Sequence, residues 1–325
     1  MKRKLVLCAA AVALLASVFS GTSVHAEDKV KLMLDWTPGG LAGAWYLGIK
    51  NGCFPDRGIN LTVERGYGGS DTVTKIAAGV AEFGTADLSS IMIGRVSADA
   101  KVKAIMPLYS TSPVSVGVLS ASGITKLADL EGKTLAHAPG DSGIKILPIA
   151  FEQAGIDFGK VNIQTVEAAA LSGLLIQGQV DAITTFITTA RLINGAAQKV
   201  GKSVTTINFG AELGVYSNSL LTSDKIAAEN PDLVQRFKEA AKCSLLAAKE
   251  DLQAAVEAMN ESVGGMDVPL QVSTAEAALP LVFDDPKYQA GGFEWNMDGV
   301  AATLEVSKKA QGLVTDLEPK DFIVQ

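Results

Sequence analysis

The sequence predicts an α/β protein, and three observations support this class. Short apolar or alternating runs recur along the chain, and each precedes a Gly-rich turn and a stretch with helical spacing. This strand–turn–helix unit stands near the start of the chain and again near its middle. Hydrophobic residues make up 48% of the 325 residues, which is enough for a substantial core. A chain of this length is expected to form two domains.

The N-terminal residues predict a secretory signal. Lys2-Arg3-Lys4 gives a basic start, residues 5–19 form a short apolar core, and small residues around Ala26 suit a cleavage site. We therefore assign residues 1–26 to a signal peptide and expect a mature periplasmic protein that begins near Glu27. No later apolar run is long enough to span a bilayer.

Composition excludes several classes of function. A net charge of −7 without a Lys/Arg-rich stripe argues against a nucleic-acid partner. After loss of the signal the chain holds one histidine, His137, so neither a His-based metal cluster nor a Ser-His-Asp triad is expected. No catalytic motif is present, and we expect no cofactor. Cys53 and Cys243 are compatible either with a disulfide or with two buried thiols.

The first unit opens on an apolar strand that ends in Asp35 and Trp36, continues through a Gly-rich turn, and enters a helix at Ala44. Open α/β sheets bind ligands at such turns, because free backbone N–H groups point outward there. An acid and an indole beside this turn suit a core poorly, so we predict that both contact a ligand. Trp45 and Tyr46 are candidates either for the same site or for the core.

The second unit has a strand at residues 59–64 and a helix over 72–81. Ser70 is the expected N-cap of this helix, because its hydroxyl can accept from a free backbone N–H. We also place Gly69 and Ser70 among the candidate ligand contacts, because they stand at a helix start.

A third strand ends at Asp87, which either contacts the ligand or caps the following helix. The buried strand at residues 103–108 places Tyr109 just past its end. An extended segment over 113–119 follows.

The middle of the chain repeats the same device. A strand ends before Pro139, and either Asp141 or Ser142 can cap the next helix, whose N–H groups offer an anion site. Further along, a short strand places Thr185 and Phe186 at its end. A strand over 204–209 and a polar crossing segment over 210–218 follow, and the rest of the chain beyond residue 230 is mainly helical.

Six motifs, LDWTP, GGSD, GTAD, DLEGK, GDSG and GQVDA, occur in this order. In them the chain resembles the thiamine-pyrimidine-synthase-like periplasmic substrate-binding proteins of ABC transporters, the group that binds nitrate, sulfonates, taurine and thiamine precursors. The resemblance implies a type II periplasmic-binding-protein-like fold, with two α/β lobes joined by a two-segment hinge. Lobe 1 is then expected at residues 27–112 plus 214–325, and lobe 2 at residues 113–213.

The resemblance also implies a function. A monomer would close on a small planar or anionic organic solute and deliver it to the permease of an ABC importer. An alternative is a thiamine-pyrimidine synthase-like enzyme or thiamine-precursor-binding protein of the same fold, although the first turn lacks the histidine of those enzymes and no Cys-rich segment is present. A sensing partner of a membrane kinase is a third possibility. The expected ligand contacts are Asp35, Trp36, Trp45, Tyr46, Gly69, Ser70, Asp87, Tyr109, Asp141, Ser142, Thr185, Phe186 and Tyr216.

The chemistry of the ligand stays open at this point. A buried Asp35 requires a donor, which favours an amine or amide on the ligand. Helix N-termini favour a carboxylate, a sulfonate or nitrate. The sequence alone leaves both classes of ligand possible.

Overall fold

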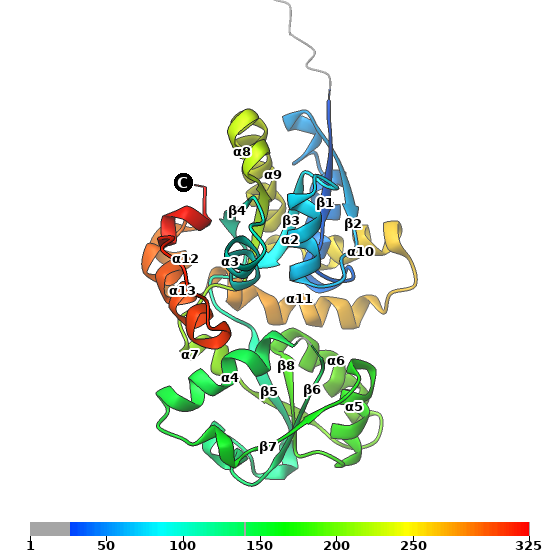
Figure 1. Cartoon of the computed structure of the whole chain (residues 1–325). Coiled ribbons are helices and arrows are strands. Elements are labelled where there is room, and N and C mark those ends of the chain that lie inside the picture. Colours follow the sequence, from blue (N-terminus) through cyan, green and yellow to red (C-terminus); the bar gives the residue numbers. More distant parts are fainter. Residues whose placement is uncertain (1–26, 140, 325) are drawn as a thin grey trace, which may run out of the picture.

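The chain folds into two α/β lobes, drawn one above the other in Figure 1. This computed structural model describes residues 27–139 and 141–324. The signal peptide expected at residues 1–26 lies outside the described residues. Within the described part, no helix is both long and apolar enough to cross a membrane.

The first sheet has five strands in the order β2-β1-β3-β10-β4. Strand β10 runs antiparallel to both of its neighbours, whereas β1 is parallel to β2 and to β3. The carboxyl ends of β1, β3 and β4 therefore meet the amino end of β10 at one edge of the sheet. The strands are β1 (Asp28–Met33), β2 (Ile59–Glu64), β3 (Phe83–Asp87), β4 (Val102–Pro107) and β10 (Asn218–Ser223).

The second sheet also has five strands, in the order β7-β6-β8-β5-β9. Strand β5 is antiparallel to β8 and β9, and β6 is parallel to β7 and β8. Strand β5 is the first strand after the crossing from the first lobe, and it stands between β8 and β9 rather than at an edge. The strands are β5 (Val114–Leu119), β6 (Thr134–His137), β7 (Asn162–Thr165), β8 (Ala182–Phe186) and β9 (Val204–Ile207).

Helices cover the faces of both sheets (Figure 1). In the first lobe they are α1 (Gly43–Lys50), α2 (Gly69–Ala77), α3 (Leu88–Ser97), α8 (Asp224–Glu229), α9 (Pro231–Glu250), α10 (Leu252–Val263), α11 (Val268–Phe283), α12 (Pro286–Gly291) and α13 (Met297–Gln311). In the second lobe they are α4 (Ser142–Gln153), α5 (Ala168–Gln177), α6 (Ile187–Gln198) and α7 (Phe209–Glu212).

Two local expectations for α2 are wrong. Its N-cap is Gly68, with a φ of 121°, and not Ser70, which lies inside the first turn. The helix ends at Ala77 rather than Ala81, because the chain turns at Gly79 with a φ of 74°. Both positions use the positive φ that glycine adopts without a steric penalty.

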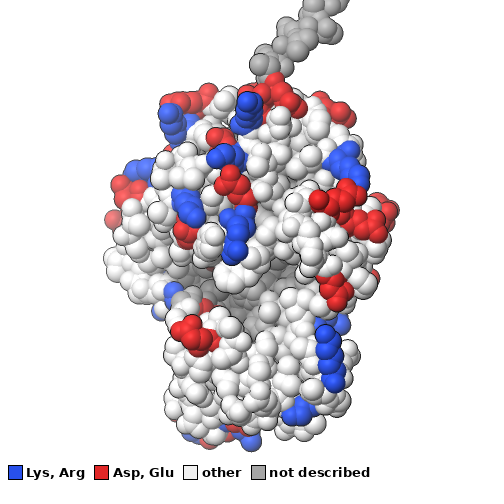
Figure 2. Space-filling model, turned by 90° about the vertical axis from the view of Figure 1, so that its right-hand side faces the viewer, with Lys and Arg blue, Asp and Glu red and all other residues white. Residues whose placement is uncertain are grey.

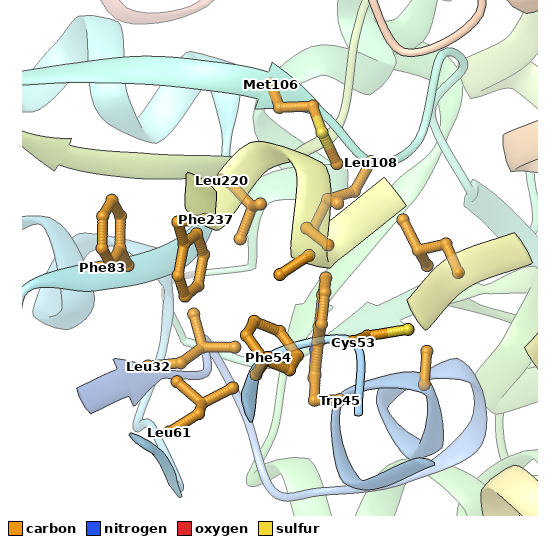
Figure 3. Packing of buried hydrophobic residues seen from close by; sticks show 14 of the residues in the cluster. Leu32, Trp45, Cys53, Phe54, Leu61, Phe83, Met106, Leu108, Leu220 and Phe237 are labelled. Carbon is orange, nitrogen blue, oxygen red and sulfur yellow. The ribbon is translucent and has the colours of Figure 1, made fainter. Parts of the chain in front are cut away.

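The core of the first lobe joins elements that are far apart in the sequence. The rings of Phe83 and Phe237 stack with centroids 3.8 Å apart, and Phe54 packs on Phe237 at 5.6 Å (Figure 3). Beside them Cys53 and Cys243 form a disulfide, with their Cα atoms 5.8 Å apart. This bond ties the loop after α1 to α9 and answers the question that the sequence left open.

The lobes are connected by two crossing segments and by two helices. The chain passes to the second lobe between β4 and β5 and returns between α7 and β10. Helix α11 packs against α6, and α13 contacts both α3 and α4 (Figure 1). On α13, Leu304 belongs to a core cluster of the first lobe and Val306 to a core cluster of the second.

Candidate functional site

A cleft with a volume of about 710 Å³ lies between the lobes, and Figure 2 shows the surface hollowed there. Its lining comes from both sheets, from both crossing segments and from the helices that connect the lobes. A cavity of this size falls within the range of about 300–1,000 Å³ that is usual for small-molecule sites. The cleft is therefore the candidate functional site.

A polar cluster on the first-lobe side is built from three neighbouring strands. Oδ1 of Asp35 accepts from the hydroxyl of Thr85 at 2.8 Å, and Oδ2 accepts from Nδ2 of Asn218 at 2.9 Å. These residues stand just after β1, on β3 and at the start of β10, and strand pairing brings them to one edge. Burial raises the pKa of the Asp35 carboxyl, while the hydrogen bonds from Thr85 and Asn218 oppose this shift.

Asp87 has two roles that the sequence left as alternatives. Its carboxylate caps α3, because Oδ1 accepts from the backbone N–H of Ser90 at 2.8 Å, and it also accepts from the hydroxyls of Ser89 and Ser90. The capping interpretation is thus confirmed. The same residue lines the cleft, and its charge contributes to the raised pKa of Asp35.

Asp141 caps α4 in the second lobe and lines the cleft. Its Oδ1 accepts from the N–H of Gly143 at 2.6 Å, and its carboxylate also binds the hydroxyl of Thr184. One N–H group that the sequence offered to an anion is therefore already bound by a carboxylate of the chain itself. Ser142 is the first residue of α4, and its side chain lies outside the described part of the structure.

Aromatic residues stand at the rim of the cleft on both lobes. Trp36 follows β1 and is 63% exposed, whereas Phe186 ends β8 and is 40% exposed. Both line the cleft, as does Thr185. Two exposed aromatic rings on opposite lobes suit the two faces of a planar ligand.

Three other predicted aromatics are held inside the fold. Trp45 is 3% exposed and packs in the core (Figure 3). It also forms part of the cleft wall. Tyr109 lines the cleft, and burial together with the nearby Asp35 charge raises the pKa of its hydroxyl, which stays protonated at neutral pH. Tyr46 belongs to the core and does not line the cleft.

Tyr216 reaches the cleft but is mainly a structural residue. Its ring is buried and packs edge-on against Trp295, with centroids 5.2 Å apart. Its hydroxyl accepts from the backbone N–H of Asn296 at 2.9 Å, and its own N–H donates to Thr303. These contacts hold the second crossing segment against α13.

Gly69 and Ser70 are not brought to the cleft lining. They form the first turn of α2, and Gly69 instead packs against the capped start of α3: a Cβ there would lie 3.1 Å from Oδ2 of Asp87. The expectation that this second helix start faces the ligand therefore does not match the cleft. The cause is the tight approach of α2 to α3.

Thr85 was not predicted from the sequence to be a site residue, although the sequence contains a signal for it. It stands two residues before Asp87 on β3, and alternate residues of a strand point to the same face. Ser307 and Val306 of α13 also line the cleft. Nothing in the sequence near them indicates a site, because the helix reaches the cleft only through its packing between the lobes.

The two α/β lobes enclose a ligand-sized cleft at the carboxyl ends of their strands, which is where open α/β sheets bind ligands. The fold and the cleft are therefore those of a two-lobed binding protein. The chain belongs to the family described as NMT1/THI5 like, whose model matches residues 42–255.

Curated relatives of the chain are also described as binding proteins. The formylaminopyrimidine-binding protein of Halalkalibacterium halodurans is 25% identical over 182 residues, which cover 55% of this chain and 54% of that protein. A binding protein of Brucella abortus is 22% identical over 220 residues, or 66% of each chain. The chain thus matches only about half to two thirds of the length of these relatives.

Solved structures share the fold over nearly the whole chain. The periplasmic aliphatic sulphonate binding protein SsuA of Escherichia coli superposes with a TM-score of 0.70 at 16% identity, covering 91% of this chain and 92% of that chain. The alkanesulfonate-binding protein SsuA of Xanthomonas axonopodis pv. citri, bound to MOPS, gives a TM-score of 0.65 at 14% identity, covering 91% and 98%. At these identities the likeness shows the fold alone.

Proposed function

We propose that this protein is a solute-binding protein that captures a small organic solute between its lobes and presents it to an ABC importer. The observation that carries this proposal is the cleft, whose lining comes from both lobes and both crossing segments. Binding rather than catalysis is the proposed activity, and it is supported by relatives that are themselves binding proteins.

The mechanism is closure about the crossing segments. In an open form the solute contacts one lobe, and contacts such as those of Trp36 and Phe186 are made together only after closure. A solute shifts the population toward the closed form only by this difference in binding free energy. We propose lobe boundaries at residues 27–112 plus 214–325 for lobe 1 and 113–213 for lobe 2. The position of these boundaries between β4 and β5 and between α7 and β10 supports this division.

A periplasmic location is supported by two independent features. The basic and apolar N-terminus has the pattern of a secretory signal. The Cys53–Cys243 disulfide suits an oxidising compartment such as the periplasm. The partner of a monomeric binding protein there would be the permease of the importer.

The proposal is tested with purified mature protein against a panel of amines, pyrimidines, sulfonates and aromatic acids, including formylaminopyrimidine. A solute should raise the thermal midpoint, because it binds only the folded chain. The same solute should reduce the radius of gyration in small-angle scattering, because the lobes close. A compound that stabilises the protein without compaction would contradict closure, and a panel without any stabilising compound would contradict solute binding.

A further inference from the structure

The charge on the cleft has one sign. Its lining includes the carboxylates of Asp35, Asp87 and Asp141, and no Lys, Arg or His among the described residues lines it. An anionic ligand would therefore enter a cavity that offers no cation for pairing. A ligand with positive charge, or with several N–H donors, meets carboxylate acceptors at the ends of both sheets.

The helix starts do not reverse this preference. Those of α3 and α4 are occupied by the capping carboxylates of Asp87 and Asp141. The starts of α5 and α6 have no side-chain cap. Each such start supplies only about half a unit of positive charge, against a full negative charge on each carboxylate. An acceptor group of the ligand can therefore bind at the uncapped helix starts of the second lobe. The full charges of the carboxylates, however, favour a ligand that donates hydrogen bonds.

Asp35 is the acceptor best placed to determine this preference. It is held by Thr85 and Asn218, with its orientation fixed by both. Two donors leave lone pairs free on its oxygens, because a carboxylate has about four acceptor positions. The neighbouring Asp87 adds a second negative charge, and the exposed indole of Trp36 attracts cations to its face.

We propose that the first-lobe side of the cleft is a subsite for a nitrogen base, so that the solute is an amine, amidine or amino-substituted heterocycle and not a sulfonate or carboxylate. Asp35 accepts the N–H groups of this base, and Trp36 and Phe186 flank its ring. The inference rests on the proposed function, and it separates this chain from the sulfonate-binding proteins whose fold it shares.

Three planar probes of nearly equal shape test the proposal by calorimetry: benzamidine, benzamide and benzoate. We expect benzamidine to bind at least about tenfold more tightly than benzoate, with benzamide between them. Tighter binding of benzoate than of benzamidine would overturn the subsite, and compaction with benzoate would leave the proposed function standing. If none of the three binds, the nitrogen-base subsite fails, whereas the proposed function is still judged by the solute panel.

The variant Asp35→Asn assigns the preference to one residue. It keeps the size of the side chain and should reduce the benzamidine-over-benzamide ratio to near one, while benzamide still binds. The matched control Asp56→Asn removes an equal charge from an exposed position of the first lobe outside the cleft, and should keep the wild-type ratio. An unchanged ratio in Asp35→Asn would contradict the assignment, as would an equal loss in the control.

Discussion

The Asp35 carboxylate should cost stability in the unliganded protein, and this cost can be measured. Burial raises its pKa in the folded state above the unfolded value of about 3.9. The folded state then binds the proton more tightly than the unfolded state does. Stability from this group is therefore greatest at low pH and falls as the pH rises through the folded pKa. Each unit of difference in pKa corresponds to about 1.4 kcal/mol.

Two substitutions at this position separate charge from hydrogen bonding. Asp35→Asn removes the buried charge but keeps an acceptor, so at neutral pH the unliganded variant should match or exceed the wild type in stability. Asp35→Ala removes both acceptors and leaves the donors of Thr85 and Asn218 without this partner. The Asn oxygen can still accept from one of these two donors. At about 1–3 kcal/mol for each buried donor left unpaired, the Ala variant should therefore be about 1–3 kcal/mol less stable than the Asn variant.

Urea denaturation followed by circular dichroism provides the assay, over a range from about pH 4 to pH 8. The wild type should lose stability relative to Asp35→Asn as the pH rises through this range. If Asp35→Asn is as unstable at neutral pH as Asp35→Ala, the charge stabilises the unliganded fold and the argument from burial is refuted.

Three further predictions concern the rim, the disulfide and the hinge. Trp36→Ala should weaken the binding of a planar ligand by about 0.5–1.5 kcal/mol without lowering the thermal midpoint of the unliganded protein. Tyr67 is similarly exposed but lies outside the cleft lining, so Tyr67→Ala should change neither quantity. Equal losses of affinity in the two variants, measured by calorimetry, would contradict a ligand contact by Trp36. Replacing Cys53 and Cys243 by Ser should lower the free energy of unfolding by about 2–5 kcal/mol, because the bond closes a loop of 190 residues; an unchanged urea midpoint would exclude this contribution. Lys287 lies outside the cleft and contacts both crossing segments: its Nζ donates to the backbone oxygen of Ser110 at 2.6 Å and lies 5.1 Å from the centre of the Tyr216 ring. Lys287→Met should therefore change the affinity for the ligand. Identical affinity and identical scattering would rule out a role of Lys287 in the hinge.

The sequence predicted the strand–turn–helix units, because each is a local pattern. The strand expected at residues 59–64 has the same bounds in the structure. Strand β10 was missed, since residues 218–223 are central in the sheet and almost fully buried, so they show no alternation of polar and apolar residues.

The same missed strand explains what the sequence could not say about the site. The contact of Asn218 with Asp35 joins residues 183 positions apart, and only the insertion of β10 between β3 and β4 creates it. The disulfide depends in the same way on the packing of α9 against α1. By contrast, Asp87 and Asp141 were identified from local turns, although capping and lining the cleft proved to be compatible for each.

Distances between spin labels across the cleft test closure most directly. Labels at the exposed positions Val80 in the first lobe and Val200 in the second report the separation of the lobes. With a saturating ligand found in the solute panel, we predict that the distance distribution moves to shorter values and narrows. The same distribution with and without that ligand would contradict closure of the lobes around a solute.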